Sequence, residues 1–444
     1  MHRSSKRRRA LVALVAAAAL TGAPAPAHAA RNLAGVPPEL TEQAASQNFL
    51  VHFTSAPGDP NAIAPDAAQG LLVGAERALG DSRSRIDLPA PMDDGDGRAD
   101  VYVYAGTDRG PERGLVRADS RDDRTTGWIG LSPDATGDML AVTHQVVHLQ
   151  QLGLYRPAGR VLAEGSATWA PLHLYAGEIR SLPDQAQFFP DDPVDCDDPD
   201  VCSLPGYNAW RFFELLAERH GPQIVRAIYD RSRALGAKDH RSHLIQALQD
   251  VLTDRQTTLP ATYAEYTAAN LVGGYGLQTL ARRRYGATEP FDDLATGTRT
   301  RRFRSRAVTL DHLSAAFYRL RSGSDAAGSG GRRCRRARML VRVAGPKDLE
   351  APLYWAPFRP RRGKARTIEL KKGNATLELP WSTCGGREVG IALENPAAAA
   401  DDRTFTLTVR LAVVRSAAKR SAAQRSAGAK RRSRTASRAP RGLR

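Results

Sequence analysis

The sequence predicts an α+β protein in which a mixed α/β domain is followed by a β-sandwich domain. Between residues 31 and 285, short apolar runs typical of strands are interspersed with longer segments whose apolar residues recur at helical spacing. Between residues 300 and 414, apolar and polar residues alternate with period 2, as in strands with one buried face. The length of 444 residues allows two domains of this size.

The expected elements of the mixed domain follow from these two periodicities. Strands are predicted at residues 48–53, 101–104 and 127–131. Helices are predicted at 61–79, from 138 onward, and at 161–176, 207–234, 239–253 and 260–272.

The predicted β-sandwich contains several strands separated by Gly, Pro and Asn. Residues 339–343 and 375–379 are two of them, and in residues 405–413 every odd position is apolar, so one face is expected to be buried. Residues 415–444 consist mainly of Ala, Ser, Arg and Lys, with almost nothing to bury, which predicts a disordered basic tail.

Residues 1–30 have the composition of a secretory signal peptide. Five Arg or Lys residues precede the apolar run from Ala10 to Leu20, and Ala-His-Ala at residues 27–29 supplies small residues around a cleavage point. The run is too short to span a bilayer, and no later segment is long enough. We therefore expect a secreted, soluble mature chain without a transmembrane span; an uncleaved signal anchor is the alternative.

The net charge of +17 invites a nucleic-acid-binding interpretation, but its distribution argues against one. Residues 1–30 contain five Arg or Lys and no acid, and residues 415–444 contain eleven and no acid. Subtracting both from the total leaves +1 for residues 31–414. The body of the protein is nearly neutral, so no basic face for specific nucleic-acid binding is predicted.

The four cysteines are expected to be structural, because disulfides persist in exported proteins. Cys196 and Cys202 are six residues apart, and Cys334 and Cys384 are fifty apart. Pairing within each set is the simplest of the three possible connectivities.

A candidate zinc site lies on the helix predicted from residue 138. His144 and His148 are four residues apart, so their side chains share one helix face, one turn apart. Two imidazole nitrogens placed in this way can both reach one zinc ion at about 2.0–2.1 Å. A short turn and an antiparallel second helix would return Glu164 to the pair, giving a two-His, one-carboxylate set with an open fourth position.

The alternative is a half-buried histidine pair that holds no metal. The spacing of His240 and His243 shows how easily such pairs arise, and we interpret that later pair as a solvated helix face. The apolar helix, the segment that follows Glu164 and the export signal together favour a metal site at the first pair.

The motif resembles the gluzincin group of zinc metallopeptidases. In that group His-Glu-x-x-His is followed by Glu-x-x-Ala on the next helix; here His144-Gln-Val-Val-His148 is followed by Glu164-Gly-Ser-Ala167. The resemblance implies that His144, His148 and Glu164 bind Zn²⁺ and that the reaction is peptide-bond hydrolysis.

More narrowly, residues 46–275 resemble a family of secreted bacterial zinc metalloproteases. Members have an N-terminal strand like residues 49–53, an Asp/Gly turn like residues 94–97 and a Tyr…Trp…Phe helix like residues 207–229. The resemblance implies a zincin-like fold for residues 31–285. It also implies that residues 127–131 could form the edge strand to which a peptide ligand adds.

One position departs from the pattern, because Gln145 stands where the family has its catalytic glutamate. That carboxylate takes a proton from the water at the metal, and an amide cannot accept it. The sequence therefore predicts retained metal binding with hydrolysis attenuated or absent. A substitute carboxylate, Glu178 or an aspartate of residues 191–200, could restore part of the activity.

Asp94, Asp96 and Asp100 are spaced with glycines as in calcium loops, which makes them candidate Ca²⁺ ligands. An ordinary Asp/Gly turn before a strand is the alternative. The sequence lacks the bidentate Glu of an EF-hand at the twelfth position.

Three functions remain open at this point. The favoured one is a secreted metallopeptidase-like protein that binds a peptide or protein ligand and hydrolyses it poorly. The second is an active secreted zinc endopeptidase that uses a substitute carboxylate. The third is a metal-free extracellular adhesion protein, and in any of them the basic tail could contact anionic cell-surface polymers through its charge.

Overall fold

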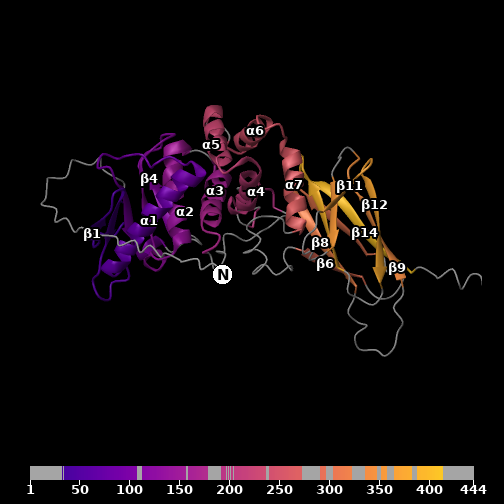
Figure 1. Ribbon diagram of the computed structural model, residues 1–444, viewed down its shortest axis with the longest axis horizontal. Helices are drawn as coiled ribbons and strands as arrows, with labels where there is room; N and C mark the ends of the chain where they lie inside the picture. Colours follow the sequence, from indigo (N-terminus) through magenta and orange to yellow (C-terminus); the bar gives the residue numbers. More distant parts are fainter. Residues whose placement is uncertain are drawn as a thin grey trace, which may run out of the picture.

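The computed structural model describes a mixed α/β protein with several antiparallel strand pairings, in agreement with the coarse prediction. The described residues are 33, 35–107, 113–156, 159–178, 192–196, 198, 200, 202–203, 205–236, 240–272, 291–296, 304–322, 336–347, 352–357, 365–382 and 388–413. Figure 1 shows an elongated molecule with a sheet at one end, helices in the middle and two further sheets at the other end.

The N-terminal sheet has the strand order β1-β2-β3-β5-β4. Its strands are β1 (Glu42–Ala45), β2 (Phe49–Phe53), β3 (Ala99–Val103), β4 (Gly114–Ala118) and β5 (Gly127–Leu131). β2, β3 and β5 run parallel to one another, whereas β1 and β4 are antiparallel to their neighbours and form the two edges.

The expectation that residues 127–131 form the sheet edge is wrong. β5 pairs with β3 on one side and with β4 on the other, and all five of its residues are buried. The edge strand is β4, whose residues are mostly half-buried. Because β4 lacks a clear apolar alternation, sequence reasoning missed it.

Two helices cover one face of this sheet, α1 (Pro65–Ile86) and α2 (Met139–Tyr155). Alternate strand residues such as Val101, Val103 and Ile129 pack with the apolar faces of both helices in one core. Asp138 caps α2, since its side chain accepts a hydrogen bond from the Leu140 N–H. The core thus fixes the start and the rotation of the helix that carries the histidines.

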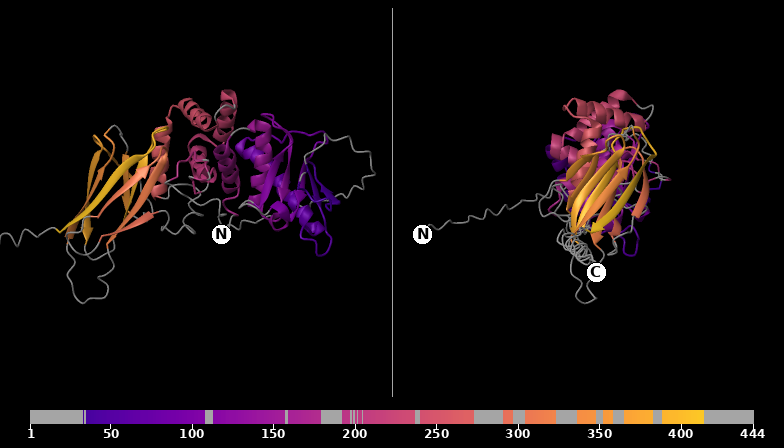
Figure 2. Two further views of the ribbon diagram at one scale, coloured as in Figure 1. Left: turned by 180° about the vertical axis from the view of Figure 1, so that it is seen from behind. Right: turned by 90° about the vertical axis from the view of Figure 1, so that its right-hand side faces the viewer.

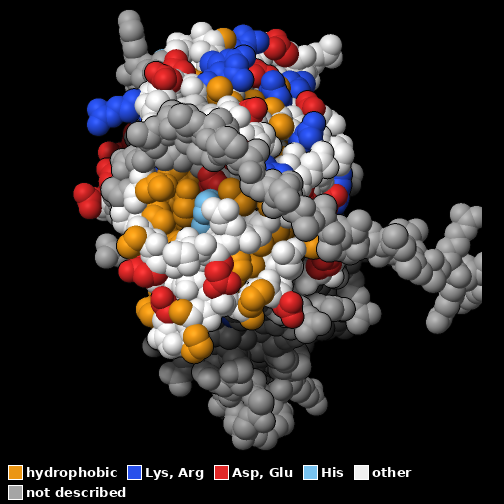
Figure 3. All heavy atoms as spheres, turned by 90° about the vertical axis from the view of Figure 1, so that its left-hand side faces the viewer, with side chains coloured by type: hydrophobic (Ala, Val, Ile, Leu, Met, Phe, Trp, Pro, Cys, Tyr) orange, Lys and Arg blue, Asp and Glu red, His pale blue; other side chains and the backbone are white. Residues whose placement is uncertain are grey.

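The opposite face of the sheet carries aromatic residues. Tyr102, Tyr104 and Trp128 form a separate cluster, and the His52 ring stacks on Tyr102 with centroids 4.4 Å apart. Figure 3 looks at this end of the molecule, where hydrophobic side chains gather around a histidine.

Five α-helices of the described residues lie in the middle of the molecule, and they share one apolar core with the later turns of α2. They are α3 (Arg160–Leu174), α4 (Trp210–His220), α5 (Ile224–Leu235), α6 (His240–Thr253) and α7 (Leu259–Val272). The single helix expected at 207–234 is divided into α4 and α5 at Gly221-Pro222, because Gly221 has a φ of 84° and proline has no N–H to continue the hydrogen bonding.

The C-terminal strands form two sheets that share one hydrophobic core, so they are the two layers of a β-sandwich. One sheet has the order β11-β10-β13-β8-β6 and the other the order β12-β9-β14-β7. The strands are β6 (Phe291–Thr296), β7 (Arg304–Leu310), β8 (Ser314–Ser322), β9 (Arg336–Ala344), β10 (Pro352–Pro357), β11 (Arg366–Glu369), β12 (Asn374–Ser382), β13 (Glu388–Asn395) and β14 (Arg403–Val413). Figure 2 shows the layers from two sides.

Helix α7 joins the helical middle to the sandwich, because Leu271 packs in a small core with Phe317, Tyr354 and Ala392 of the first sheet. Several predicted features lie outside the described residues: the signal peptide at 1–30, Cys334, Cys384 and the tail at 415–444. Among the described helices, none combines the length and apolarity that a membrane crossing requires.

Candidate metal centre

Helices α2 and α3 bring the three predicted zinc ligands together. The Nε2 atoms of His144 and His148 lie 2.9 Å apart. Glu164 Oε2, from α3, lies 3.1 Å from the Nε2 of His148 and 3.5 Å from the Nε2 of His144. The three atoms therefore converge on one point between the two helices.

These separations fit a zinc ion. Three ligand atoms placed at about 2.0–2.1 Å from a tetrahedral ion are about 3.3 Å from one another. The observed separations of 2.9, 3.1 and 3.5 Å bracket that value. Two neutral imidazoles and one carboxylate also form a ligand set typical of catalytic zinc.

A glutamine fixes the tautomer of His148. Gln151 donates through Nε2 to the carbonyl of Ala163 and to Ser166 Oγ, both at 3.0 Å, so its Oε1 must face the histidine. His148 Nδ1 lies 2.7 Å from that Oε1 and therefore carries the proton that it donates. The Nε2 atom of His148 faces Glu164 and His144, where the lone pair of a neutral ring would be directed toward a metal ion.

A proline in α3 supports His144 in the same way. Pro171 has no N–H, so it leaves the carbonyl of Ala167 without its usual helical hydrogen bond. The ring of His144 makes a hydrogen bond to the backbone of Ala167. Both histidines thus have a partner for the ring nitrogen that faces away from the candidate site.

The surroundings of His144 and Glu164 favour the protonation states in which these side chains can bind a metal ion. Burial, reinforced by the charge of His148, lowers the pKa of His144. Burial alone would raise the pKa of Glu164, but the charge of His148 and hydrogen bonds from both histidines hold it well below its usual range. Near neutral pH, Glu164 is therefore ionised and His144 neutral.

A pocket of about 340 Å³ opens beside this triad. Its walls include Gly114 to Val116 of the edge strand β4, His148 of α2 and Glu164 of α3, while His144 is buried behind them. A ligand in the pocket would lie between the edge of the sheet and the candidate metal ligands.

Gln145 lines the same pocket and is only 1% exposed. Its side chain lies against the backbone of β4: a Cβ atom on Gly114 would come within 3.0 Å of both Cγ and Nε2 of Gln145. In the described part of the chain, no hydrogen-bond partner contacts its Oε1. The position expected for a general base thus holds an ordered amide.

The described carboxylates considered as substitute bases do not line the pocket, and Asp191 and Asp197 lie outside the described residues. Glu178 forms an exposed pair with Arg77, whose Nη2 is 2.5 Å from Glu178 Oε1. In the acidic loop, Asp192 accepts from the Ser203 N–H, and Asp195 pairs with His312. Among the described residues that line the pocket, Glu164 is the only carboxylate.

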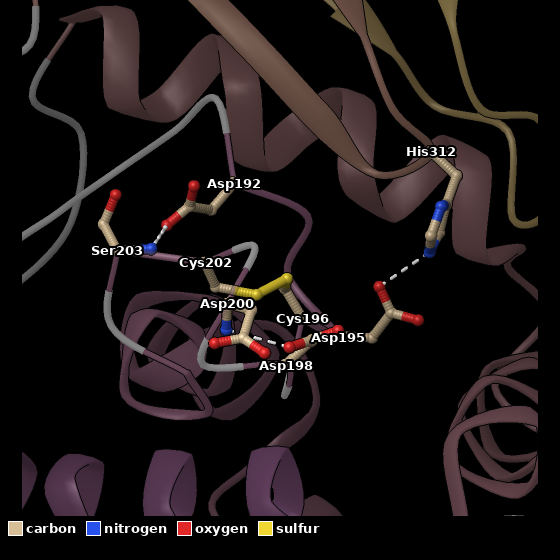
Figure 4. Close-up of a disulfide and its surroundings, with 8 residues drawn as sticks. All are labelled: Asp192, Asp195, Cys196, Asp198, Asp200, Cys202, Ser203 and His312. Carbon is tan, nitrogen blue, oxygen red and sulfur yellow. Dashed lines mark hydrogen bonds and ion pairs between the residues drawn. A yellow bond between two sulfur atoms is a disulfide. The ribbon is translucent and has the colours of Figure 1, made fainter.

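The disulfide between Cys196 and Cys202, drawn in Figure 4, is linked through the backbone to a further wall of the site. The carbonyl of Cys196 accepts a hydrogen bond of 2.9 Å from the Gly206 N–H. The next residue, Tyr207, lines the pocket, and its ring lies nearly parallel to that of His144, with centroids 6.4 Å apart. The pairing agrees with the local connectivity suggested by the spacing.

The predicted calcium ligands are only partly brought together. Asp94 and Asp96 lie in one cluster with Asp93, in which the oxygens are within 4.8 Å of one another. Asp100 is not part of it, because it belongs to β3 and its Oδ1 lies 2.7 Å from His52 Nε2. Asp93 was missed, although its Oδ1 accepts hydrogen bonds from two glycine N–H groups of the turn. Calcium binding there stays a prediction.

Gly114, Gln151 and Tyr207 also belong to the site and were not predicted from the sequence. Gln151 could have been found, because it follows His148 by three residues and so lies on the same helix face. Gly114 and Tyr207 reach the site from distant elements, and nothing in their local sequence marks them.

No family model matches the sequence, and none of the curated proteins compared with it matches either. Among solved structures, the pre-peptidase C-terminal domain of a Bacillus anthracis collagenase is 9% identical, with a TM-score of 0.20, covering 28% of this chain and 99% of that chain. A Bacillus thuringiensis Cry1Da tryptic core variant is 9% identical, with a TM-score of 0.17, covering 28% of this chain and 25% of that chain. A family GH115 4-O-methyl-α-glucuronidase is 11% identical, with a TM-score of 0.15, covering 62% of this chain and 42% of that chain. At these TM-scores the likenesses carry no argument about function.

Proposed function

We propose that this chain is a secreted zinc-metallopeptidase-like protein with a zincin-like N-terminal domain. In this proposal His144, His148 and Glu164 hold zinc, and Gln145 leaves peptide hydrolysis attenuated or absent, so the protein acts mainly by binding a peptide or protein ligand. The observation that carries the proposal is the convergence of the three ligand atoms, within 3.5 Å of one another, at the wall of an open pocket.

The surroundings of the triad support a zinc site over a metal-free histidine pair. Each histidine has a hydrogen-bond partner for its outer ring nitrogen, as zinc-bound histidines usually do. Burial and charge keep Glu164 ionised and His144 neutral, and these are the forms that bind metal.

A zinc ion held there would act as a Lewis acid toward a peptide carbonyl and toward water. Gln145 can donate or accept a hydrogen bond at this position, but it cannot take up a proton. Since Glu164 is the only carboxylate among the described lining residues, the second candidate function, an active endopeptidase with a substitute base, has no residue to perform it in this part of the chain.

The edge strand β4 supports a peptide as the ligand. An edge strand presents backbone N–H and C=O groups to which an extended peptide can add. Gly114 to Val116 of β4 line the pocket next to His148, so a peptide paired along this edge would pass the metal ligands.

Metal analysis tests the proposal. The purified chain, dialysed against zinc and then against metal-free buffer, is expected to retain one zinc per molecule. His144→Ala and His148→Ala should each lose it, whereas His243→Ala should retain it, because that ring bonds to the Gly236 carbonyl and is not part of the triad. A wild-type protein without stoichiometric zinc, and unchanged in stability by His144→Ala, would refute the metal site and leave the metal-free adhesion function.

Export is tested independently of the metal. The chain is expressed in a bacterial host with its first thirty residues, and the protein in the culture medium is sequenced from its N-terminus. Cleavage after the Ala-His-Ala sequence at residues 27–29 is expected. Retention of an intact chain in the cell membrane would instead identify an uncleaved anchor.

A further inference from the structure

Two arginines line the pocket without a carboxylate partner. Arg156, at the end of α2, donates only to backbone carbonyls: its Nε lies 2.9 Å from the Asp122 oxygen, and it also contacts the carbonyl of Arg121. The side chain of Arg160, at the start of α3, makes no hydrogen bond or ion pair within the part of the chain that the structure describes. No carboxylate of the described residues pairs with either guanidinium, so both charges are available to a ligand.

This contrasts with arginines elsewhere on the helices. Arg77 pairs with Glu178 and Asp81, and Arg226 pairs with Asp230. Arg231 likewise pairs with Asp250. Arg85 and Arg124 also donate only to backbone carbonyls, but neither lines the pocket, so what distinguishes Arg156 and Arg160 is their position beside the candidate metal ligands.

The carboxylate of Glu164 does not neutralise the charges of Arg156 and Arg160. Glu164 is the one carboxylate among the described lining residues, and it is held by His144 and His148. A zinc ion on the triad would add two further positive charges. A ligand that brings a negative charge would lower the electrostatic energy of the pocket, whereas a cationic one would raise it.

Arg156 is held by hydrogen bonds, whereas Arg160 is exposed and only the stem of its side chain is packed. The stem of Arg160 packs against Gly206: a Cβ atom at that position would come within 2.9 Å of Arg160 Cγ. Gly206 is in turn bonded to Cys196 of the disulfide. Arg156 is anchored by the carbonyls of residues 121 and 122, so its side chain needs little further ordering on binding, whereas a ligand would order the guanidinium of Arg160.

We propose that Arg160, assisted by Arg156, forms a carboxylate-binding subsite, so that the peptide ligand of this pocket carries an anionic group beside the metal ligands. A planar guanidinium donates two parallel hydrogen bonds to a carboxylate. The group is either the C-terminal carboxylate of a peptide or an acidic side chain. The inference rests on the proposed function only in taking the pocket as a peptide-binding site.

Calorimetric binding of short peptides to the full chain tests the subsite. Four acetylated Ala/Leu hexapeptides are compared: one amidated with a central Glu, one with a free C-terminal carboxylate and no Glu, one amidated with a central Gln, and one amidated with a central Lys. We expect at least one carboxylate peptide to bind about fivefold more tightly than the Gln peptide, which is the scale of one partly exposed ion pair. The Lys peptide should bind most weakly.

Arg160→Gln should abolish the preference for the carboxylate, and Arg226→Gln, a matched change at a paired arginine, should preserve it. Arg156→Gln is less decisive because it also releases the loop at residues 121–122. The comparison of the Glu peptide with the free-terminus peptide decides which source of carboxylate the subsite takes.

Each titration is performed with zinc and with chelator, so that failure of the subsite and failure of the zinc site can be distinguished. A carboxylate preference in a protein that binds no zinc would support the subsite and refute the metal proposal. Equal binding of Glu, Gln and Lys peptides, binding of none of the four, or an unchanged preference in Arg160→Gln would overturn the subsite, even in a protein that retains zinc.

Discussion

The imidazole Nε2 of His312 lies 2.8 Å from Oδ1 of Asp195, although the two residues belong to different parts of the molecule. Asp195 lies beside the disulfide, and His312 lies in the turn between β7 and β8 of the sandwich (Figure 4). The other ring nitrogen of His312 donates to Asp401. With a carboxylate at each nitrogen, the ring is most stable as an imidazolium that joins the disulfide loop to the sandwich.

The charge of His312 predicts a pH-dependent contact between the two regions. Burial lowers the pKa of His312, but hydrogen bonds and charge from Asp195 and Asp401 more than offset it, so the folded-state pKa is raised above the usual 6.5. The stabilisation is therefore fully present below about pH 6.5 and is lost as the pH rises through the raised value.

Urea unfolding with chelator present, between pH 5.5 and 9, measures this effect on wild type and on His312→Asn. At pH 6 the variant should be less stable by roughly 3 kcal/mol, because two carboxylates lose a buried cation. The difference in unfolding free energy between wild type and His312→Asn should become smaller as the pH rises. A difference that is constant across the range would show that the imidazolium charge contributes nothing.

Glu394 predicts a second pH effect, at the contact between α7 and the sandwich. This carboxyl group is buried, and its Oε1 accepts a hydrogen bond of 3.2 Å from the Tyr354 hydroxyl. Burial raises the pKa of Glu394 to about 8. The folded state holds the neutral acid, so stability should fall as the pH rises from about 4.5 to about 8.

Glu394→Gln keeps the shape of the side chain and removes its titration. The variant should lose the part of the pH dependence that lies between these values, and at pH 8 it should be more stable than wild type by a few kcal/mol. Thermal unfolding of wild type and of Glu394→Gln at pH 5 and at pH 8 measures this effect. If the two proteins lose equal stability between these pH values, Glu394 is already ionised in the folded state.

Gln145→Glu should create the proton acceptor that the site lacks. The substitution is nearly isosteric, and the space beside Gly114 already holds a side chain of this length. Peptide hydrolysis should rise by about 10²–10⁴-fold over wild type. Cleavage of a quenched fluorescent peptide, with and without chelator, measures it, and Gln145→Ala serves as the inactive reference. Wild-type cleavage as fast as that of Gln145→Glu, and equally sensitive to chelator, would show that another group already acts as the base.

The sequence could predict the triad because its members lie on two consecutive helices. The four-residue spacing of His144 and His148 sets their common face, and a short connection is enough to return Glu164 to them. Periodicity likewise identified most helices and the alternating strands of the sandwich.

The features that could not be predicted depend on the order of the strands in the sheet and on contacts between residues far apart in the sequence. β4 follows β3 in sequence but lies beyond β5 in the sheet, so the edge next to the pocket was assigned to the wrong strand. Asp100 was grouped with the Asp/Gly turn, yet as the second residue of β3 it points to the sheet face where His52 lies. Tyr207 reaches His144 only through the disulfide loop, which no local pattern reveals.

Gly114→Ala tests whether the β4 backbone positions residue 145. The added Cβ would lie 3.0 Å from Cγ and from Nε2 of Gln145, which is closer than carbon atoms normally pack, so the side chain must move. In the Gln145→Glu background, the substitution should lower the rate of peptide cleavage at least tenfold, since a general base must lie within hydrogen-bond reach of the proton it takes. Zinc affinity should be unchanged, because the three atoms nearest to the added Cβ all belong to Gln145 and none of them is a candidate ligand atom. Gly70→Ala, in α1, where an added Cβ meets nothing within 4 Å, is the control and should leave cleavage unaltered. Equal cleavage rates for the two alanine variants would show that β4 does not position this side chain.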